Sequence, residues 1–119
     1  MTIGHRGTLE PLLLRGAALS VAAGTIGFLF IGGDWRLSNL FLFPDLLVSA
    51  LLALGAFTAE QAMRPILLGG FAMGIGVFSA AAAGYVVDGR FGVGATSALV
   101  TCVVAGTWLL LDLTSGRLR

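Results

Sequence analysis

Charge is the scarcest property of this chain. Asp, Glu, Lys and Arg make up 11% of its 119 residues, and all of its basic residues are arginine. A soluble domain carries about 25% charged residues, and a chain of this length has too small an interior to hide so much apolar surface. The net charge of +1 provides no basic surface for nucleic acid. These scarcities exclude an ordinary soluble domain and a nucleic-acid-binding protein.

Groups that carry chemistry are also few. The chain has one histidine and one cysteine, which excludes an internal disulfide and a Cys/His metal cluster. Its glycine-rich pieces lie inside apolar runs, so they give no phosphate loop. A membrane enzyme needs several polar groups that converge in one cavity, whereas the middles of these runs hold apolar or small residues. We therefore expect no enzymatic activity, no cofactor and no soluble small-molecule substrate.

Long apolar runs fill most of the chain. Hydrophobic residues make up 57% of the sequence, and the mean hydropathy is +0.98. About 20 apolar residues cross a bilayer as a helix, and helices satisfy every backbone group internally. The runs predict an all-α integral membrane bundle of four transmembrane helices. The transmembrane domain is expected over residues 11–113, between an N-terminal arm (1–10) and a tail (114–119), with spans at 11–31, 40–59, 65–87 and 94–111.

The connectors and the arginines predict the topology. Short connectors make neighbouring helices antiparallel, in an up-down order. Most of the arginines fall in or next to the N-terminal arm, the second connector and the tail, so the positive-inside rule places both termini in the cytoplasm. Arg15 is expected to extend to the lipid headgroups. The use of Arg in place of Lys indicates a bacterial protein, located in the inner membrane.

Proline positions predict where helices begin. Pro11 and Pro65 both stand at the start of an apolar run. Proline suits the first helical turn, because its missing N–H costs nothing there. We therefore expect both residues to begin helices. If Pro44 follows the same pattern it begins the second helix; the alternative is a helix that begins at Asn39 as the N-cap, with a kink near Pro44.

Small residues recur at helical spacing in two of the runs. This spacing lets another helix approach closely. We predict that these residues pack helices together within the bundle, and that any such face left outward favours a partner protein. The residues are Gly16, Ser20 and Gly24 in the first run, and Gly70, Gly74, Gly76, Ala80 and Gly84 in the third.

Asp45 is the best candidate for a functional side chain. A carboxylate inside a span is a functional hypothesis by default, here proton or substrate coupling or contact with a partner. On a helix it shares a face with Ser49 and Leu52, which would direct it toward another helix. The alternative is structural: if Pro44 begins the helix, Asp45 is an early-turn acid that the helix dipole favours. Both interpretations remain open.

Two charged connectors accompany Asp45 on the side opposite the termini. Residues 34–36 and 88–90 both read Asp-x-Arg. They are either solvated loop charges or a docking rim for another membrane protein, and either arginine could pair with Asp45 instead. The candidate partner-binding residues are Asp34, Arg36, Asn39, Asp45, Asp88 and Arg90.

A bundle with an apolar interior, close-packing faces and short loops predicts a supporting role. The leading hypothesis is a non-enzymatic accessory or stabilising subunit of a larger inner-membrane complex, such as a transport complex. Its partners would be membrane lipids and other membrane-protein subunits. One alternative is a small proton-coupled transporter that acts as a homo-oligomer, with Asp45 as the proton site. The other is a lipid- or quinone-binding membrane protein.

Overall fold

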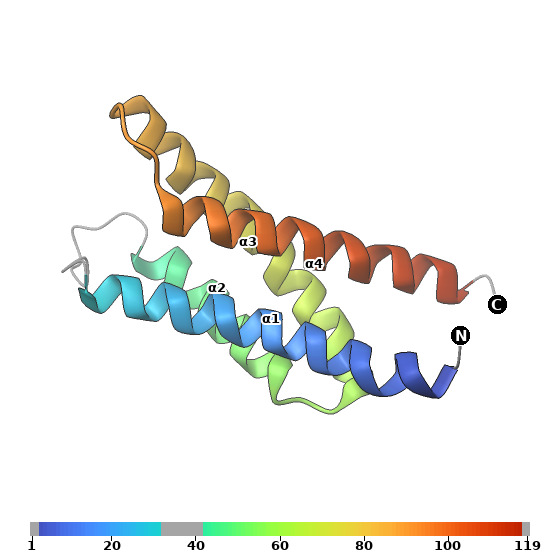
Figure 1. Ribbon diagram of the computed structural model, residues 1–119. Helices are drawn as coiled ribbons and strands as arrows, with labels where there is room; N and C mark the ends of the chain where they lie inside the picture. The colour runs from blue at the N-terminus through green and yellow to red at the C-terminus, as the bar shows by residue number, and fades with distance from the viewer. Residues whose placement is uncertain (1–2, 32–41, 118–119) are drawn as a thin grey trace.

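The fold is an up-down bundle of helices, as the sequence predicts. A computed structural model describes residues 3–31 and 42–117. These form α1 (Ile3–Ile31), α2 (Leu42–Ala56), α3 (Glu60–Val87) and α4 (Val93–Arg117). Helices that follow one another run antiparallel, so α1 begins and α4 ends at the same end of the molecule (Figure 1). The predicted all-α class and up-down order are therefore confirmed.

Three of the helices are long and apolar enough to cross a membrane. The candidate spans are Leu9–Ile31, Gln61–Val87 and Val93–Thr114. The fourth helix, α2, has 15 residues, which is about 22 Å at the helical rise and shorter than the hydrocarbon core of about 30 Å. The structure thus supports a multi-pass membrane protein through three helices, and crossing by α2 stays a prediction.

Apolar side chains cover the outside of these helices. No more than a third of each candidate span is buried inside the bundle, from 22% in the α4 span to 33% in the α1 span. Large side chains such as Ile31, Phe57 and Val87 are almost fully exposed. A soluble monomer rarely exposes a contiguous apolar surface of this kind. Lipid tails would cover this apolar surface without the free-energy cost of exposing it to water.

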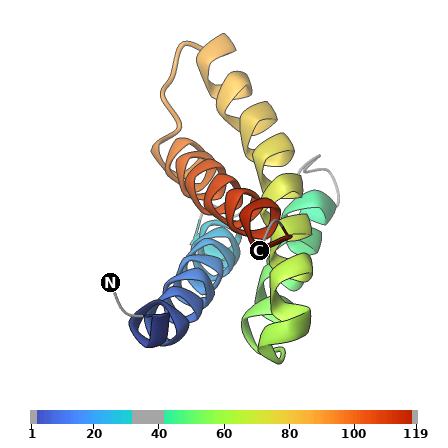
Figure 2. The ribbon, with the colours of Figure 1, turned by 90° about the vertical axis from the view of Figure 1, so that its right-hand side faces the viewer.

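The core lies along the inner faces of α2, α3 and α4 and is closed by α1. Side chains with no exposed surface include Leu52 of α2, Met63, Leu67 and Phe71 of α3, and Leu109 of α4. The helices contact one another mainly in chain order, whereas α1 contacts α3 and α4 much less. Toward its C-terminal end, α3 leans away from α1 and α2 (Figures 1 and 2). The bundle is therefore well packed at one end and open at the other.

Two glycines of α3 allow the close approach of neighbouring helices. A Cβ added at Gly70 would lie 2.7 Å from Leu52 Cδ2, and one added at Gly74 would lie 2.6 Å from Cys102 Sγ. Cys102 itself is completely buried. The space that a side chain would need at these two positions is already filled by α2 and α4. Glycine there lets α3 pack against both neighbours at once.

Two of the proline predictions are wrong. Pro11 lies inside α1, which begins at Ile3, and Pro65 lies inside α3, which begins at Glu60. Proline removes one helical hydrogen bond and crowds the preceding turn, so the residues before it need other contacts. Glu10 has such a contact in an ion pair with Arg64, and Met63 is completely buried. Tertiary packing therefore keeps the turn before each proline helical.

Candidate functional site

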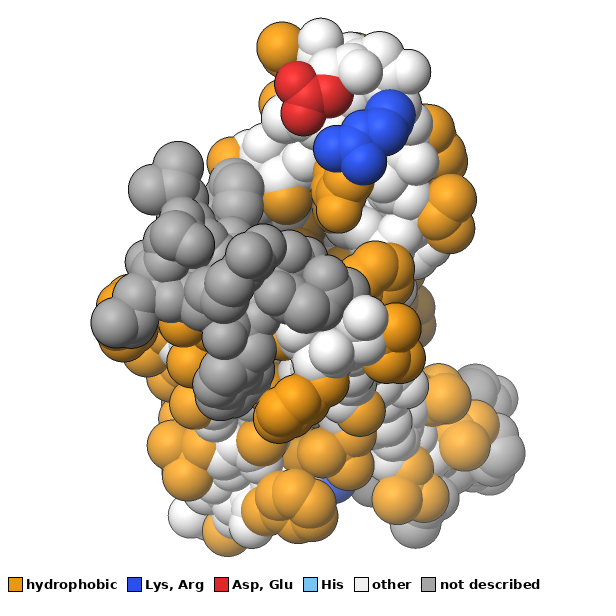
Figure 3. Space-filling view, turned by 90° about the vertical axis from the view of Figure 1, so that its left-hand side faces the viewer, with side chains coloured by type: hydrophobic (Ala, Val, Ile, Leu, Met, Phe, Trp, Pro, Cys, Tyr) orange, Lys and Arg blue, Asp and Glu red, His pale blue; other side chains and the backbone are white. Residues whose placement is uncertain are grey.

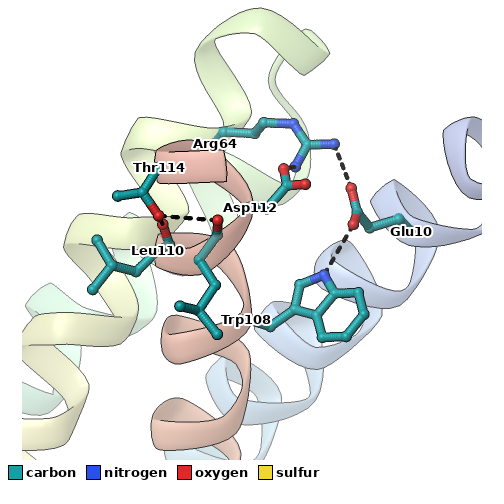
Figure 4. A network of polar contacts seen from close by, with 7 residues as sticks. Glu10, Arg64, Trp108, Leu110, Asp112 and Thr114 are labelled. Carbon is teal, nitrogen blue, oxygen red and sulfur yellow. Dashed lines mark hydrogen bonds and ion pairs between the residues drawn. The ribbon is translucent and has the colours of Figure 1, made fainter. Parts of the chain in front are cut away.

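A partly buried ion-pair cluster joins three helices at the end where α1 begins and α4 ends. Arg64 of α3 donates one hydrogen bond to Glu10 Oε1 of α1 and one to Asp112 Oδ2 of α4, both 2.8 Å long. Trp108 of α4 donates its Nε1–H to Glu10 Oε2 over 2.9 Å (Figure 4). The Arg64, Glu10 and Asp112 side chains are only 18%, 11% and 21% exposed. We call these four residues the polar clamp.

The polar clamp fixes helices rather than presenting reactive groups. The planar guanidinium of Arg64 binds two carboxylates in defined directions, which sets the positions of α1 and α4 relative to α3. The predicted spans at 40–59 and 65–87 leave residues 60–64 as a connector. In the structure these residues are the first turn of α3, which begins at Glu60. The predicted topology already put Glu10, Arg64 and Asp112 on one side of the membrane. Their predicted location on the same side of the membrane is the feature of the sequence from which the polar clamp could have been predicted.

Arg15 stabilises the C-terminal end of α2. Its Nη1 donates hydrogen bonds to the carbonyl oxygens of Ala56 at 2.6 Å and Thr58 at 2.8 Å. The last carbonyls of a helix lack partners within the helix, and a cation is favoured near that negative end. The position of Arg15 relative to the lipid headgroups stays a prediction, and the structure adds its contact with the end of α2. Its guanidinium group binds backbone carbonyl oxygens of the same protein.

Replacing Arg15 with leucine is expected to lower the free energy of unfolding by about 2 kcal/mol, because two charge-assisted hydrogen bonds are lost. Denaturant titration in mixed micelles, followed by circular dichroism, measures the change. Arg15→Lys is the matched control and should recover part of the stability, since it keeps the charge. Equal stability of the leucine variant and the parent protein would show that the contact contributes nothing.

An open groove lies at the opposite end, between α1, the start of α2, the end of α3 and the start of α4. Its volume is about 880 Å³. Figure 3 looks onto this end of the molecule, where apolar side chains are spread over much of the described surface and an acidic and a basic side chain lie close together at the top. Helix residues on its walls are mostly small or apolar, with a few hydroxyl groups: Ser20, Val21, Gly24, Thr25, Phe28, Leu29, Phe78, Ala81, Gly84, Tyr85, Val93, Gly94, Ala95, Ser97, Ala98 and Thr101.

Asp45 lines this groove from the first turn of α2. The helix begins at Leu42, which confirms that Pro44 and Asp45 belong to an early turn. The carboxylate is half-buried, and the structure gives it no hydrogen bond or ion pair with any residue in 3–31 or 42–117. Asp45 therefore lies in the first turn of a helix and also lines the groove.

The expected rim is only partly within the described chain. Asp88 and Arg90 line the groove at its mouth, where Arg90 Nη2 lies 3.7 Å from Asp88 Oδ2. The Arg90 guanidinium also lies over the Tyr85 ring, 5.1 Å from its centre. Asp34, Arg36 and Asn39 fall outside the described residues. The structure thus brings Asp45, Asp88 and Arg90 to one groove and leaves the remaining rim residues as predictions.

The predicted small-residue faces divide into two groups. Gly70 and Gly74 lie at contacts within the bundle, as described above. A Cβ at Gly16, Gly24, Gly76 or Gly84 would meet no atom within 4 Å, and Ser20 and Ala80 are exposed. Three members of this second group, Ser20, Gly24 and Gly84, line the groove. Their faces are therefore turned toward open space instead of another helix of this chain.

A shallower depression lies between α1 and α2, with a volume of about 740 Å³. Its lining includes Ser49, whose buried hydroxyl has no hydrogen-bond partner within the described residues. Small residues such as Ala23, Gly27 and Ala50 form the rest of its floor. This depression is a second concave face of the molecule.

No protein-family model, curated protein or solved structure matches this chain. Among the side chains that the structure describes, no three of His, Cys, Asp and Glu come together as a group able to hold a metal ion.

Proposed function

We propose that this chain is a non-enzymatic membrane subunit that binds and stabilises a larger membrane-protein complex. The observation that carries the proposal is the open groove of about 880 Å³. Its walls hold small residues at the spacing that lets helices approach closely, yet none of the helices within residues 3–31 and 42–117 occupies it. A partner would cover that surface.

The rest of the bundle supports the same role. The polar clamp and the Arg15 contact use charged side chains to fix helices to one another. The described connectors are short, with residues 57–59 between α2 and α3 and residues 88–92 between α3 and α4. These connectors have no room for a soluble catalytic domain. A partner protein would therefore bind the membrane-facing surface of the helices.

Purification from native membranes in a mild detergent tests the proposal. We expect the tagged protein to migrate in an assembly larger than its own oligomers, with another membrane protein at a fixed ratio. The reconstituted chain alone should move no substrate in liposomes. A monodisperse homo-oligomer that transports substrate by itself would contradict this proposal.

A second candidate, a small proton-coupled transporter, rests on the position of Asp45. Its half-buried carboxylate lines a groove that is open to the outside, and an intramembrane acid is a candidate proton site. Under this proposal Asp45→Asn abolishes transport in liposomes while the protein still folds, and Asp88→Asn at the exposed mouth preserves it. Loss of assembly without any transport in the parent protein would favour the subunit role.

A further inference from the structure

We propose that the groove accepts one transmembrane helix of a partner subunit, and that this helix carries a lysine or arginine where it passes Asp45. The inference rests on the proposed subunit function and names the chemistry of its partner.

The shape of the groove fits a helix. Gly24 of α1 and Gly84 of α3 have no atom within 4 Å of an added Cβ, so a backbone can approach closely from both sides. Ala95 and Ser97 of α4 continue the small lining. A volume of about 880 Å³ equals about two turns of a helix 10 Å in diameter. If only half of the helix's cross-section lies inside the groove, the same volume holds about four turns.

The Asp45 carboxylate in the groove lining can pair with a cation supplied by a partner. Arg15 is bound at the far end of α2, and Arg64 is held in the polar clamp. Arg90 lies between Asp88 and the Tyr85 ring. Each arginine side chain that the structure describes thus has a partner other than Asp45.

Removing the Asp45 carboxylate further from water would be costly without a cation. A basic residue on the incoming helix supplies that cation. The hydroxyl groups of Thr25 and Thr101, which also line the groove, offer further oxygen atoms to its N–H groups. The pair would be formed at the edge of the membrane, since Asp45 lies in the first turn of α2.

A lipid chain is the main competitor for the same space. An acyl chain would satisfy the apolar wall, but it would bury the Asp45 carboxylate against methylene groups. A basic helix matches the carboxylate and also gains from glycine-mediated backbone contact. The observations therefore favour a helix with one positive charge over a lipid.

The test uses synthetic apolar helices of about 21 residues, each with a single lysine at one of a series of depths, and a matched helix with leucine in its place. Energy transfer between labelled helix and labelled protein is measured in vesicles of phosphatidylethanolamine and phosphatidylglycerol. We expect lysine at one depth to bind at least tenfold more tightly than the leucine helix. Asp45→Asn should remove that preference, whereas Glu60→Gln, at the start of α3 and outside the groove lining, should preserve it.

A second variant tests the groove itself. Gly24→Leu places a side chain in it, and a Cβ at this position meets no atom within 4 Å. We therefore expect the protein to fold and to bind every helix at least tenfold more weakly. Equal binding of lysine and leucine helices, or a lysine preference that persists in Asp45→Asn, would overturn the inference. Native copurification would be unaffected by that result, so the subunit proposal and this inference can fail separately.

Discussion

Replacing Arg64 with methionine is expected to destabilise the bundle by about 3 kcal/mol, because it removes the cation that two partly buried carboxylates share. Glu10 and Asp112 each lose a charge-assisted hydrogen bond of 2.8 Å. Methionine keeps most of the apolar stem, so the loss reports the charge. Unfolding in mixed micelles, followed by circular dichroism, measures it, and Trp108 fluorescence reports the local change.

Arg90→Met is the matched control for this prediction. Arg90 and Asp88 are 66% and 64% exposed, and their charged atoms lie 3.7 Å apart. An exposed pair of this kind contributes at most about 1 kcal/mol. We therefore expect the Arg90 variant to be close to the parent protein in stability. Equal losses in the two variants would contradict the distinct role assigned to the polar clamp.

Gly74→Leu is expected to be the most damaging single substitution in the core, with a loss of about 3 kcal/mol or failure to fold. The added Cβ would lie 2.6 Å from Cys102 Sγ and 3.4 Å from the Phe78 ring. Both side chains are buried, and overpacking such a core forces strained rotamers and backbone shifts. Expression level and thermal unfolding in detergent are the measurements.

Gly76→Leu provides the comparison on the same helix. No atom lies within 4 Å of a Cβ added there, so the leucine should be accommodated facing outward. We expect a stability equal to the parent protein or slightly above it, because glycine is a poor helix former. If both variants lost the same stability, the close contact of Gly74 with Cys102 would not explain the loss.

The overall architecture could be predicted from composition because apolar runs of this length leave only helices as spanning elements. Helix starts were less predictable. Pro44 lies in the first turn of its helix, whereas Pro11 and Pro65 lie further inside theirs. Contacts of Glu10 and Met63 with distant residues hold the turns before these two prolines. Such tertiary contacts are not visible in a local sequence pattern.

The candidate site was predictable in part. Asp45 stood out because a carboxylate beside a long apolar run is rare, and the structure places it in the groove. The groove itself could not be foreseen, because it depends on how α3 leans away from α1. Spacing also could not tell which glycines face inward: Gly74 and Gly76 are two residues apart on one helix, yet only Gly74 is in contact with another helix.

The central claim is that the groove is an interaction surface for another membrane protein, and site-specific photocrosslinking in native membranes tests it most directly. A photoreactive side chain is placed at Ser97, which lines the groove, or at Val104, an exposed position on the same helix outside it. We predict one discrete protein adduct from position 97 that is lost in Asp45→Asn, and none from position 104. Adducts with lipid alone, or the same adducts from both positions, would contradict the claim.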